Sequence, residues 1–314
     1  MQKQAQGQLG RDFWIFWLGQ TISNFGSSIT QFAIPLLTFR LTGSAMNLAL
    51  TTAATFLPYL LFGLIIGAWV DRLERKRLMM MVDILQALTL AMVPLAAMLG
   101  MLNVIWLYVI AFISSTLTIA FQAAEFAAIP SLVGQGDLVT ANGRIQASYS
   151  AATVFGPLAA GMLVTFLSLP NLLLVDSVTF LLSALTLFWV RTRFNSDVQA
   201  EHTNLRSAIM EGLRYVLGHP VLRAISIMMA IVNAVGASIF AQLVLFARIR
   251  LNANDSEIGI LYASGSVGVI MVSLLAGRLR RRWSFGTVAL GSLMISGILN
   301  IILAFTTSFW VAAV

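Results

Sequence analysis

The chain has 314 residues, of which 59% are hydrophobic and 10% are charged, and its formal net charge is +7. Soluble globular domains carry about 25% charged residues, so this chain has too little polar surface to fold as a water-soluble particle. It has no cysteine, which excludes disulfides and thiolate metal sites, and its two histidines, His202 and His219, are too few for a metal centre. The composition therefore predicts an integral membrane protein.

Apolar runs long enough to cross a membrane as helices recur along the whole chain. After a polar N-terminus, residues 1–12, six predicted spans form a first unit over residues 13–190. A polar connection, residues 191–220, separates this unit from residues 221–314, which hold three more spans and part of a tenth. The complete spans are expected at Phe13–Phe39, Asn47–Val70, Leu78–Leu99, Val104–Ile129, Ile145–Leu167, Leu172–Val190, Val221–Phe246, Ile258–Ala276 and Phe285–Phe305.

The basic residues predict how the chain is oriented. With a cytoplasmic N-terminus, 16 of the 19 Lys and Arg residues fall in cytoplasmic segments, and only Arg40, Arg248 and Arg250 fall outside. Lys and Arg favour cytoplasmic loops, so we expect a multi-pass protein of the inner (plasma) membrane with its N-terminus in the cytoplasm. The positive charge then indicates contact with the anionic inner leaflet of the lipid bilayer, and we expect no nucleic-acid partner.

Span one carries a stripe of polar side chains at helical spacing: Gln20, Asn24, Ser27, Ser28 and Gln31. Such a stripe must face protein or a water-filled cavity, because lipid cannot satisfy its hydrogen bonds. We expect it to line a substrate cavity, with Asn233 and Gln242 of span seven contributing from the second half. Hydrogen bonding between neighbouring helices is the alternative.

The turn after span two, "GAWVDRLERKR", holds six charged residues between two apolar runs. It resembles the signature loop of the major facilitator superfamily, in which a Gly and three residues precede Asp-Arg and a basic cluster. Other stretches, including "ISNFGSSIT", "FLPYLLFGLIIGAWVDR", "DLVTANGRIQ" and "EGLRYVLGHPVLRA", resemble the drug- and siderophore-exporting branch that includes macrolide efflux proteins and the enterobactin exporter. Glu74 stands where this loop usually has a second glycine.

The resemblance implies an all-α major facilitator fold of two six-helix bundles, here with the second bundle incomplete and nine to ten spans present. It also implies that the loop is an inner gate between the bundles, formed by Gly67, Asp71, Arg72, Arg75 and Lys76. Gly63 and Gly67 have the spacing of a close helix contact. For the basic residues, fixing the topology is the alternative role.

Ionisable residues inside spans are costly and are candidates for function. Glu125 in span four is the main candidate for proton coupling, and structural pairing or an inner-gate contact is the alternative. Asp83, near the inner end of span three, is placed with Glu125 in the proton-coupling set, although pairing with a basic residue of the loop is favoured for it. Asp176 is expected to pair with Arg40 near the outer face.

Span five contains "FGPLAAGML", which resembles the Gly-Pro motif of antiporter subfamilies. Pro157 removes one helical hydrogen bond, and Gly156 and Gly161 permit close packing. An ordinary kink is the alternative. In the connection, Leu205, Ile209, Leu213, Val216 and Leu217 share one helical face, which predicts an amphipathic helix at the inner membrane surface or against the bundle.

These features predict a secondary active transporter, with proton-coupled efflux of drug-like or siderophore-like small molecules by alternating access as the leading function. A non-transporting membrane sensor or assembly protein on the same fold, and a lipid or lysolipid transporter, are the alternatives. We expect a monomer that is not an enzyme and holds no cofactor, because the sequence has no hydrolytic triad, phosphate-binding loop or metal cluster.

Overall fold

The computed structural model describes residues 9–70, 72–195, 205–262, 264–265 and 285–313. All regular structure in these ranges is helical. The elements are α1 (Arg11–Thr42), α2 (Ala45–Val70), α3 (Arg75–Met98), α4 (Val104–Leu132), the 3-10 turn η1 (Gln135–Asp137), α5 (Leu138–Leu163), α6 (Leu169–Trp189), α7 (Leu205–Gly218), α8 (Pro220–Arg250), α10 (Phe285–Phe305) and α11 (Phe309–Ala313).

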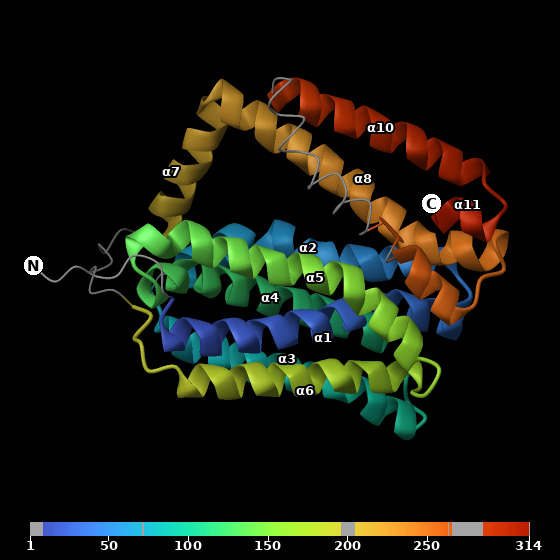
Figure 1. Cartoon of the computed structure of the whole chain (residues 1–314), viewed down its shortest axis with the longest axis horizontal. Helices are drawn as coiled ribbons and strands as arrows, with labels where there is room; N and C mark the ends of the chain where they lie inside the picture. The colour runs from blue at the N-terminus through green and yellow to red at the C-terminus, as the bar shows by residue number, and fades with distance from the viewer. Residues whose placement is uncertain (1–8, 71, 196–204, 263, 266–284, 314) are drawn as a thin grey trace, which may run out of the picture.

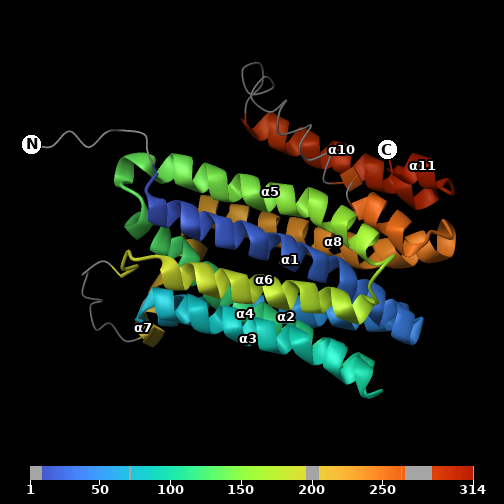
Figure 2. The same ribbon diagram turned by 60° about the horizontal axis from the view of Figure 1, so that its bottom comes forward.

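Helices α1 to α6 lie side by side as one bundle, and α8 and α10 lie along one flank of it (Figures 1 and 2). Inside the bundle α1 packs on α5 and α6, α3 packs on α4 and α6, and α2 packs on α4. The turn between α2 and α3 marks one end of the bundle, here named the α2–α3 end, and the turn between α1 and α2 marks the opposite α1–α2 end. Helix α8 starts near the α2–α3 end and finishes at the α1–α2 end (Figure 1).

The predicted helical segments overlap helices wherever they fall on described residues, although some ends differ: the span predicted at Ile145–Leu167 corresponds to α5, which ends at Leu163. Within these residues α2, α3, α4 and α6 are long and apolar enough to cross a membrane, and the bent pair of α7 and α8 makes a fifth candidate. Most of the span predicted at Ile258–Ala276 lies outside the described residues. The described residues therefore form an all-helical fold with several helices that are long and apolar enough to cross a membrane, and the count of nine to ten spans stays a prediction.

Helix α1 packs against α6 through small residues and short hydrogen bonds. A Cβ placed on Gly19 would come 1.9 Å from Thr186 Oγ1, so the two helices approach closely there. One turn from Gly26, Thr30 Oγ1 donates to Asp176 Oδ2 at 2.5 Å. Thr179 Oγ1 donates to the other carboxylate oxygen of Asp176 at 3.0 Å.

These bonds overturn the expected pairing of Asp176 with Arg40. Asp176 is buried between α1 and α6, and hydroxyl groups satisfy both of its oxygens. Arg40 pairs with Asp255 instead. The sequence placed Asp176 and Arg40 near the same membrane face, but depth alone does not determine which side chains meet.

The start of α1 binds the end of α6 at the α2–α3 end. Asp12 Oδ2 accepts hydrogen bonds from the backbone nitrogens of Arg191 and Thr192, at 2.9 and 2.7 Å, and from Thr192 Oγ1 at 2.7 Å. The last turn of a helix and the residues after it carry backbone groups without helical partners. Asp12 therefore fixes the exit of the chain from the first six helices.

Asp12→Ala removes the acceptor of these three bonds, and hydrogen bonds to charged groups contribute about 1.5–3 kcal/mol each when they are well shielded. Because Asp12 is only half-buried, we expect a smaller total loss that lowers the thermal unfolding temperature of the purified protein in detergent. Asp137→Ala is the matched control, since Asp137 makes no side-chain capping bond at the start of α5. Equal unfolding temperatures of the two variants would contradict this account.

Candidate functional site

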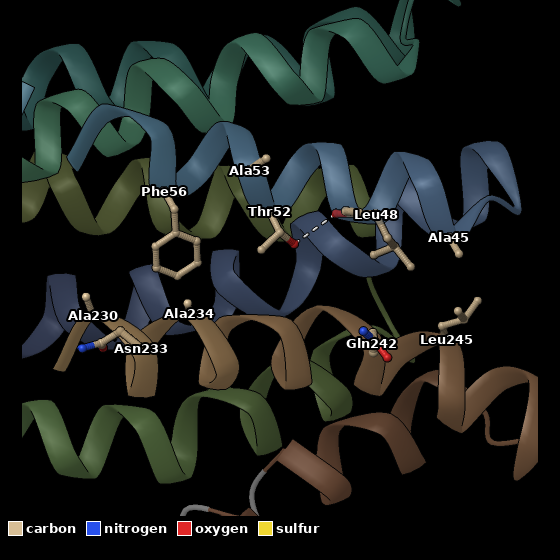
Figure 3. A pocket seen from close by; sticks show the side chains of 11 residues that line it. Ala45, Leu48, Thr52, Ala53, Phe56, Ala230, Asn233, Ala234, Gln242 and Leu245 are labelled. Atoms are coloured by element: carbon tan, nitrogen blue, oxygen red, sulfur yellow. Dashed lines mark hydrogen bonds between the residues drawn. The ribbon is translucent and has the colours of Figure 1, made fainter. Parts of the chain in front are cut away.

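A cleft of about 480 Å³ lies between the first half of α2 and residues 230–245 of α8 (Figure 3). Its walls are mostly small or apolar side chains: Ala45, Leu48, Ala49, Thr52, Ala53, Phe56, Ala230, Asn233, Ala234, Gln242 and Leu245. None of these lining residues is charged. A cleft of this kind suits an apolar molecule that needs few hydrogen bonds.

The polar groups of the cleft come from both helices. Thr52 Oγ1 donates to Leu48 O at 3.0 Å, and Asn233 Nδ2 donates to Met229 O at 2.8 Å. Each of these bonds joins two residues of the same helix. The amide oxygen of Asn233 takes no part in its bond to Met229. Gln242 lies further along α8 on the same side of the cleft (Figure 3).

A second hollow of about 690 Å³ adjoins this cleft along α2. It lies between α2 and α4, and Ala53 and Phe56 line both spaces. Its other lining residues include Leu57, Leu60 and Phe112. The two spaces together give α2 a continuous apolar surface, which the sequence analysis missed; the run "ALTTAAT" was the available signal, because small side chains leave room beside a helix.

The residues expected to line a cavity behave differently in the two halves. Asn233 and Gln242 of α8 line the cleft, but Gln20, Asn24, Ser27 and Gln31 of α1 are not among its lining residues. Gln20 is 3% exposed and its Nε2 donates to Ser183 Oγ of α6 at 3.0 Å, so it joins two helices of the first bundle. This corrects its assignment to the cavity. Ser27 is half-buried, Gln31 is exposed, and Asn24 has a buried Nδ2 without a hydrogen-bond partner among the described residues.

The second half contacts the first bundle closely at the α1–α2 end. A Cβ on Gly259 would lie 2.8 Å from Pro157 O and 3.1 Å from Gly161 Cα, so the two backbones meet there without intervening side chains. Ser256 Oγ also donates to Gly161 O at 2.8 Å. Phe32 of α1 packs edge-on against Tyr262, with ring centroids 5.9 Å apart.

The motif of span five therefore lies at two close contacts. Gly161 meets residues 256–259 of the second half, and Gly156 meets α1, where an added Cβ would come 2.3 Å from Ser28 Oγ. Pro157 lies between these glycines and presents its carbonyl oxygen to Gly259. The connection of this Gly-Pro motif with export stays a prediction.

Charged side chains complete the contact at the α1–α2 end. Asp255 is 7% exposed and forms ion pairs with Arg40, in the last turn of α1, and with Arg248, in the last turn of α8. Arg248 Nη1 also donates to Ala253 O at 3.0 Å. A buried carboxylate is stable only when charged or hydrogen-bonding partners compensate for its lost hydration. We name these three residues, Arg40, Arg248 and Asp255, the arginine–aspartate clasp.

At the α2–α3 end the basic residues bind backbone carbonyls of the first bundle. Arg75 Nη1 donates to Ala127 O of α4 and to Phe194 O after α6, both at 3.0 Å. Lys76 Nζ donates to Val190 O at 2.6 Å. Val190 is the C-cap of α6, where a cation satisfies a carbonyl without a helical partner and interacts favourably with the helix dipole. Fixing the topology is therefore not their whole role.

The other members of the predicted inner gate are Gly67, Asp71 and Arg72. Asp71 lies outside the described residues. Arg72 N closes a turn to Trp69 O at 3.1 Å, and no heavy atom of the described residues lies within 4 Å of a Cβ built on Gly63 or Gly67. The close contact expected at these two glycines is therefore not found among the described residues. Glu74, in place of the usual glycine, caps α3 by accepting from Arg77 N.

Besides Asp176, two further buried carboxyl groups have no cation partner among the described residues. Glu125 of α4 is 5% exposed; Tyr149 of α5 donates to its Oε2 at 3.5 Å, and its Oε1 has no hydrogen-bond partner among the described residues. Asp83 of α3 is fully buried, and the hydroxyl group near it is that of Ser183 of α6. The expected pairing of Asp83 with a basic residue of the loop is therefore wrong, because Arg75 and Lys76 point to backbone carbonyls.

Asp255→Asn should open the contact at the α1–α2 end, because it leaves Arg40 and Arg248 facing each other without a neutralising charge. The chain has no cysteine, so the thiol introduced by Ala247→Cys is a unique reporter at a fully buried position of this contact. We expect Asp255→Asn to raise its rate of labelling by a water-soluble maleimide several-fold.

Glu257→Gln is the matched control, because it removes a nearby carboxylate that belongs to a local turn with Asn254 and not to the clasp. Equal labelling of the thiol in the Asp255→Asn and Glu257→Gln backgrounds would show that the clasp does not hold this end closed.

Comparison with known proteins places this arrangement in a family. The chain is 28% identical over 266 residues to macrolide efflux protein A of Streptococcus pyogenes, covering 84% of this chain and 66% of that protein. It is 29% identical over 290 residues to the multidrug efflux pump Tap of Mycolicibacterium fortuitum, covering 89% of this chain and 70% of the pump. The chain thus spans about two thirds of the length of the curated relatives it matches.

A bacterial homologue of the human lysosomal transporter Spinster, solved in an inward-facing and unoccupied conformation, has the same fold. Its TM-score is 0.72 at 17% sequence identity, and the match covers 96% of this chain and 71% of that one. Residues 10–314 match the model of the family described as transmembrane secretion effector, MFS_3. The chain therefore belongs to this transmembrane secretion effector family of the major facilitator superfamily.

Proposed function

We propose that this protein exports drug-like amphiphilic molecules by alternating access, with the α2–α3 end facing the cytoplasm. The observation that carries the proposal is the position of the cleft. It lies between one helix of each half, next to a contact that closes the α1–α2 end. A pathway between two halves that is closed at the α1–α2 end can release its solute at that end only after the halves rearrange.

The relatives support the chemical class of the solute. Macrolide efflux and multidrug efflux are the activities in their names. The uncharged lining of the cleft is compatible with such solutes. Siderophore-like molecules belong to the same proposal as a second solute class.

The orientation rests on charge. The α2–α3 turn and the residues after α6 are rich in arginine and lysine, and such segments favour the cytoplasmic side. The clasp would then close the outer side, so the described arrangement would be inward-facing. In an outward-facing arrangement the second half would approach the inner gate of Gly67, Asp71, Arg72, Arg75 and Lys76.

Proton coupling is assigned to Glu125, with Asp83 as a second acid. Both lie in the part of the bundle near the α2–α3 end: about 10 Å of helix separates Glu125 from the end of α4, and about 12 Å separates Asp83 from the start of α3. A carboxylate buried without a cation is costly, so such a group binds a proton or a partner when its surroundings change. That property supports a role as proton carrier.

The direct test is expression of the gene in a bacterium that lacks its own efflux pumps. We expect lower accumulation of macrolides and other amphiphiles than in cells without the gene, and we expect a protonophore to abolish the difference. Accumulation that is unchanged across a panel of macrolides, dyes and siderophores would refute export and favour a sensor or assembly role.

Glu125→Gln tests the proton step separately. We expect the variant to reach the membrane in normal amount but to lose the dependence of transport on a pH gradient in proteoliposomes, because an amide cannot carry a proton. Glu257→Gln, which removes a carboxylate at the opposite end of the molecule, should retain that dependence. If transport by Glu125→Gln still followed the pH gradient, Glu125 would have no coupling role.

A further inference from the structure

Helix α7 runs across the direction of the membrane-spanning helices. Its last part, Gly212–Gly218, makes an angle of 97° with the start of α8, Pro220–Gly236. Helix α8 follows the bundle along its length, so α7 lies crosswise near the α2–α3 end, where it also contacts α2 (Figure 1). A helix at right angles to the spans, at the end of the bundle, lies parallel to the membrane plane at the level of the interface.

Part of the apolar face of α7 is exposed. Leu213 and Leu217, one turn apart on the face predicted to be apolar, are 39% and 51% exposed, and Met210 on the adjoining side is 49% exposed. Val216, on the same face, is half-buried. The described residues leave Leu213 and Leu217 partly exposed, whereas amphipathic helices at a bilayer surface bury such side chains at the boundary of head groups and acyl chains.

Charge identifies the partner of this face. Within α7 the sequence has two arginines, Arg206 and Arg214, against one acid, Glu211, and Arg223 follows in the first turn of α8. Arg214 and Arg223 are exposed. Arginines beside an exposed apolar face complement phosphate groups above acyl chains, and anionic head groups attract them most strongly.

We propose that α7 is a docking surface for anionic phospholipid of the bilayer that the protein spans. Leu213 and Leu217 enter the boundary of the acyl chains, and Arg214 and Arg223 bind lipid phosphates. Because α7 joins α8 directly through His219, the lipid surface also holds the start of α8 at a fixed depth. This inference rests on the proposed function only for the orientation of the chain, which places α7 at the cytoplasmic leaflet.

Two single-cysteine variants of the full chain test the docking. Leu217→Cys lies on the apolar face, and Tyr215→Cys is its matched control, because two residues separate these positions by about 200° around a helix. Tyr215 is 67% exposed, so it is equally open to labelling. Each thiol carries an environment-sensitive fluorophore in nanodiscs, made either of phosphatidylcholine alone or of phosphatidylcholine with phosphatidylglycerol.

We expect a blue shift at position 217 and strong quenching there by a nitroxide placed just below the lipid head group. Position 215 should keep an aqueous spectrum. Phosphatidylglycerol should increase the quenching at 217 by at least twofold, and Arg214→Gln should reduce that increase. Aqueous spectra at both positions, or equal quenching at 217 in both lipid mixtures, would overturn the proposal, and the latter would leave only an apolar contact with lipid.

The measurement needs neither solute nor ion gradient. A negative result in the export assay together with lipid-dependent quenching at 217 would therefore reject the transport function and keep the docking surface. The reverse combination would keep export and reject the role of α7.

Discussion

The arrangement depends on one contact, the meeting of the two halves at the α1–α2 end. The backbones of Gly161 and Gly259 approach without intervening side chains, and Asp255 is buried between Arg40 and Arg248 beside them. Close backbone approach and a fully paired carboxylate both require defined geometry, because a methyl group or a missing arginine would separate the halves. The contact fixes where α8 starts to diverge from α2 and therefore where the cleft lies.

Polar groups inside a membrane need hydrogen-bonding partners, and in the first bundle these partners join its helices into one unit. Gln20 and Thr30 of α1 bind Ser183 and Asp176 of α6, and Asp12 binds the chain just after α6. Arg75 and Lys76 bind carbonyls at the ends of α4 and α6. With these groups satisfied inside the bundle, motion between the halves does not require them to be exchanged. Glu125 and Asp83 are buried carboxyl groups that, among the described residues, have neither a cation partner nor the two hydroxyl partners of Asp176, and this is why they are proposed as proton carriers.

Much of the fold could be predicted from the sequence, because apolar runs of membrane length and the Gly, Pro and Asn turns between them place helices directly. The loop "GAWVDRLERKR" and the family resemblance also pointed to the correct superfamily. Partners were harder to predict. Helical spacing shows that Gln20 shares a face with Asn24, but it does not reveal that α6 lies opposite Gln20. In the same way, the depth of Asp176 and Arg40 suggested a pair, whereas Arg40 binds Asp255, 215 residues away in sequence. The wall of small residues on α2 was missed because a cavity is a property of two surfaces.

The most direct test of the account measures both ends of the molecule at once. Spin labels on Leu41→Cys and Ile249→Cys report the α1–α2 end, and labels on Arg191→Cys and Arg223→Cys report the α2–α3 end; all four positions are exposed and the chain has no other thiol. Electron–electron distance measurements in lipid nanodiscs should show a short separation at the first pair and a long one at the second. Disruption of the clasp by Asp255→Asn should lengthen the first and shorten the second. Distances that stay fixed at both ends, or that change in the same direction, would contradict alternating access in this protein.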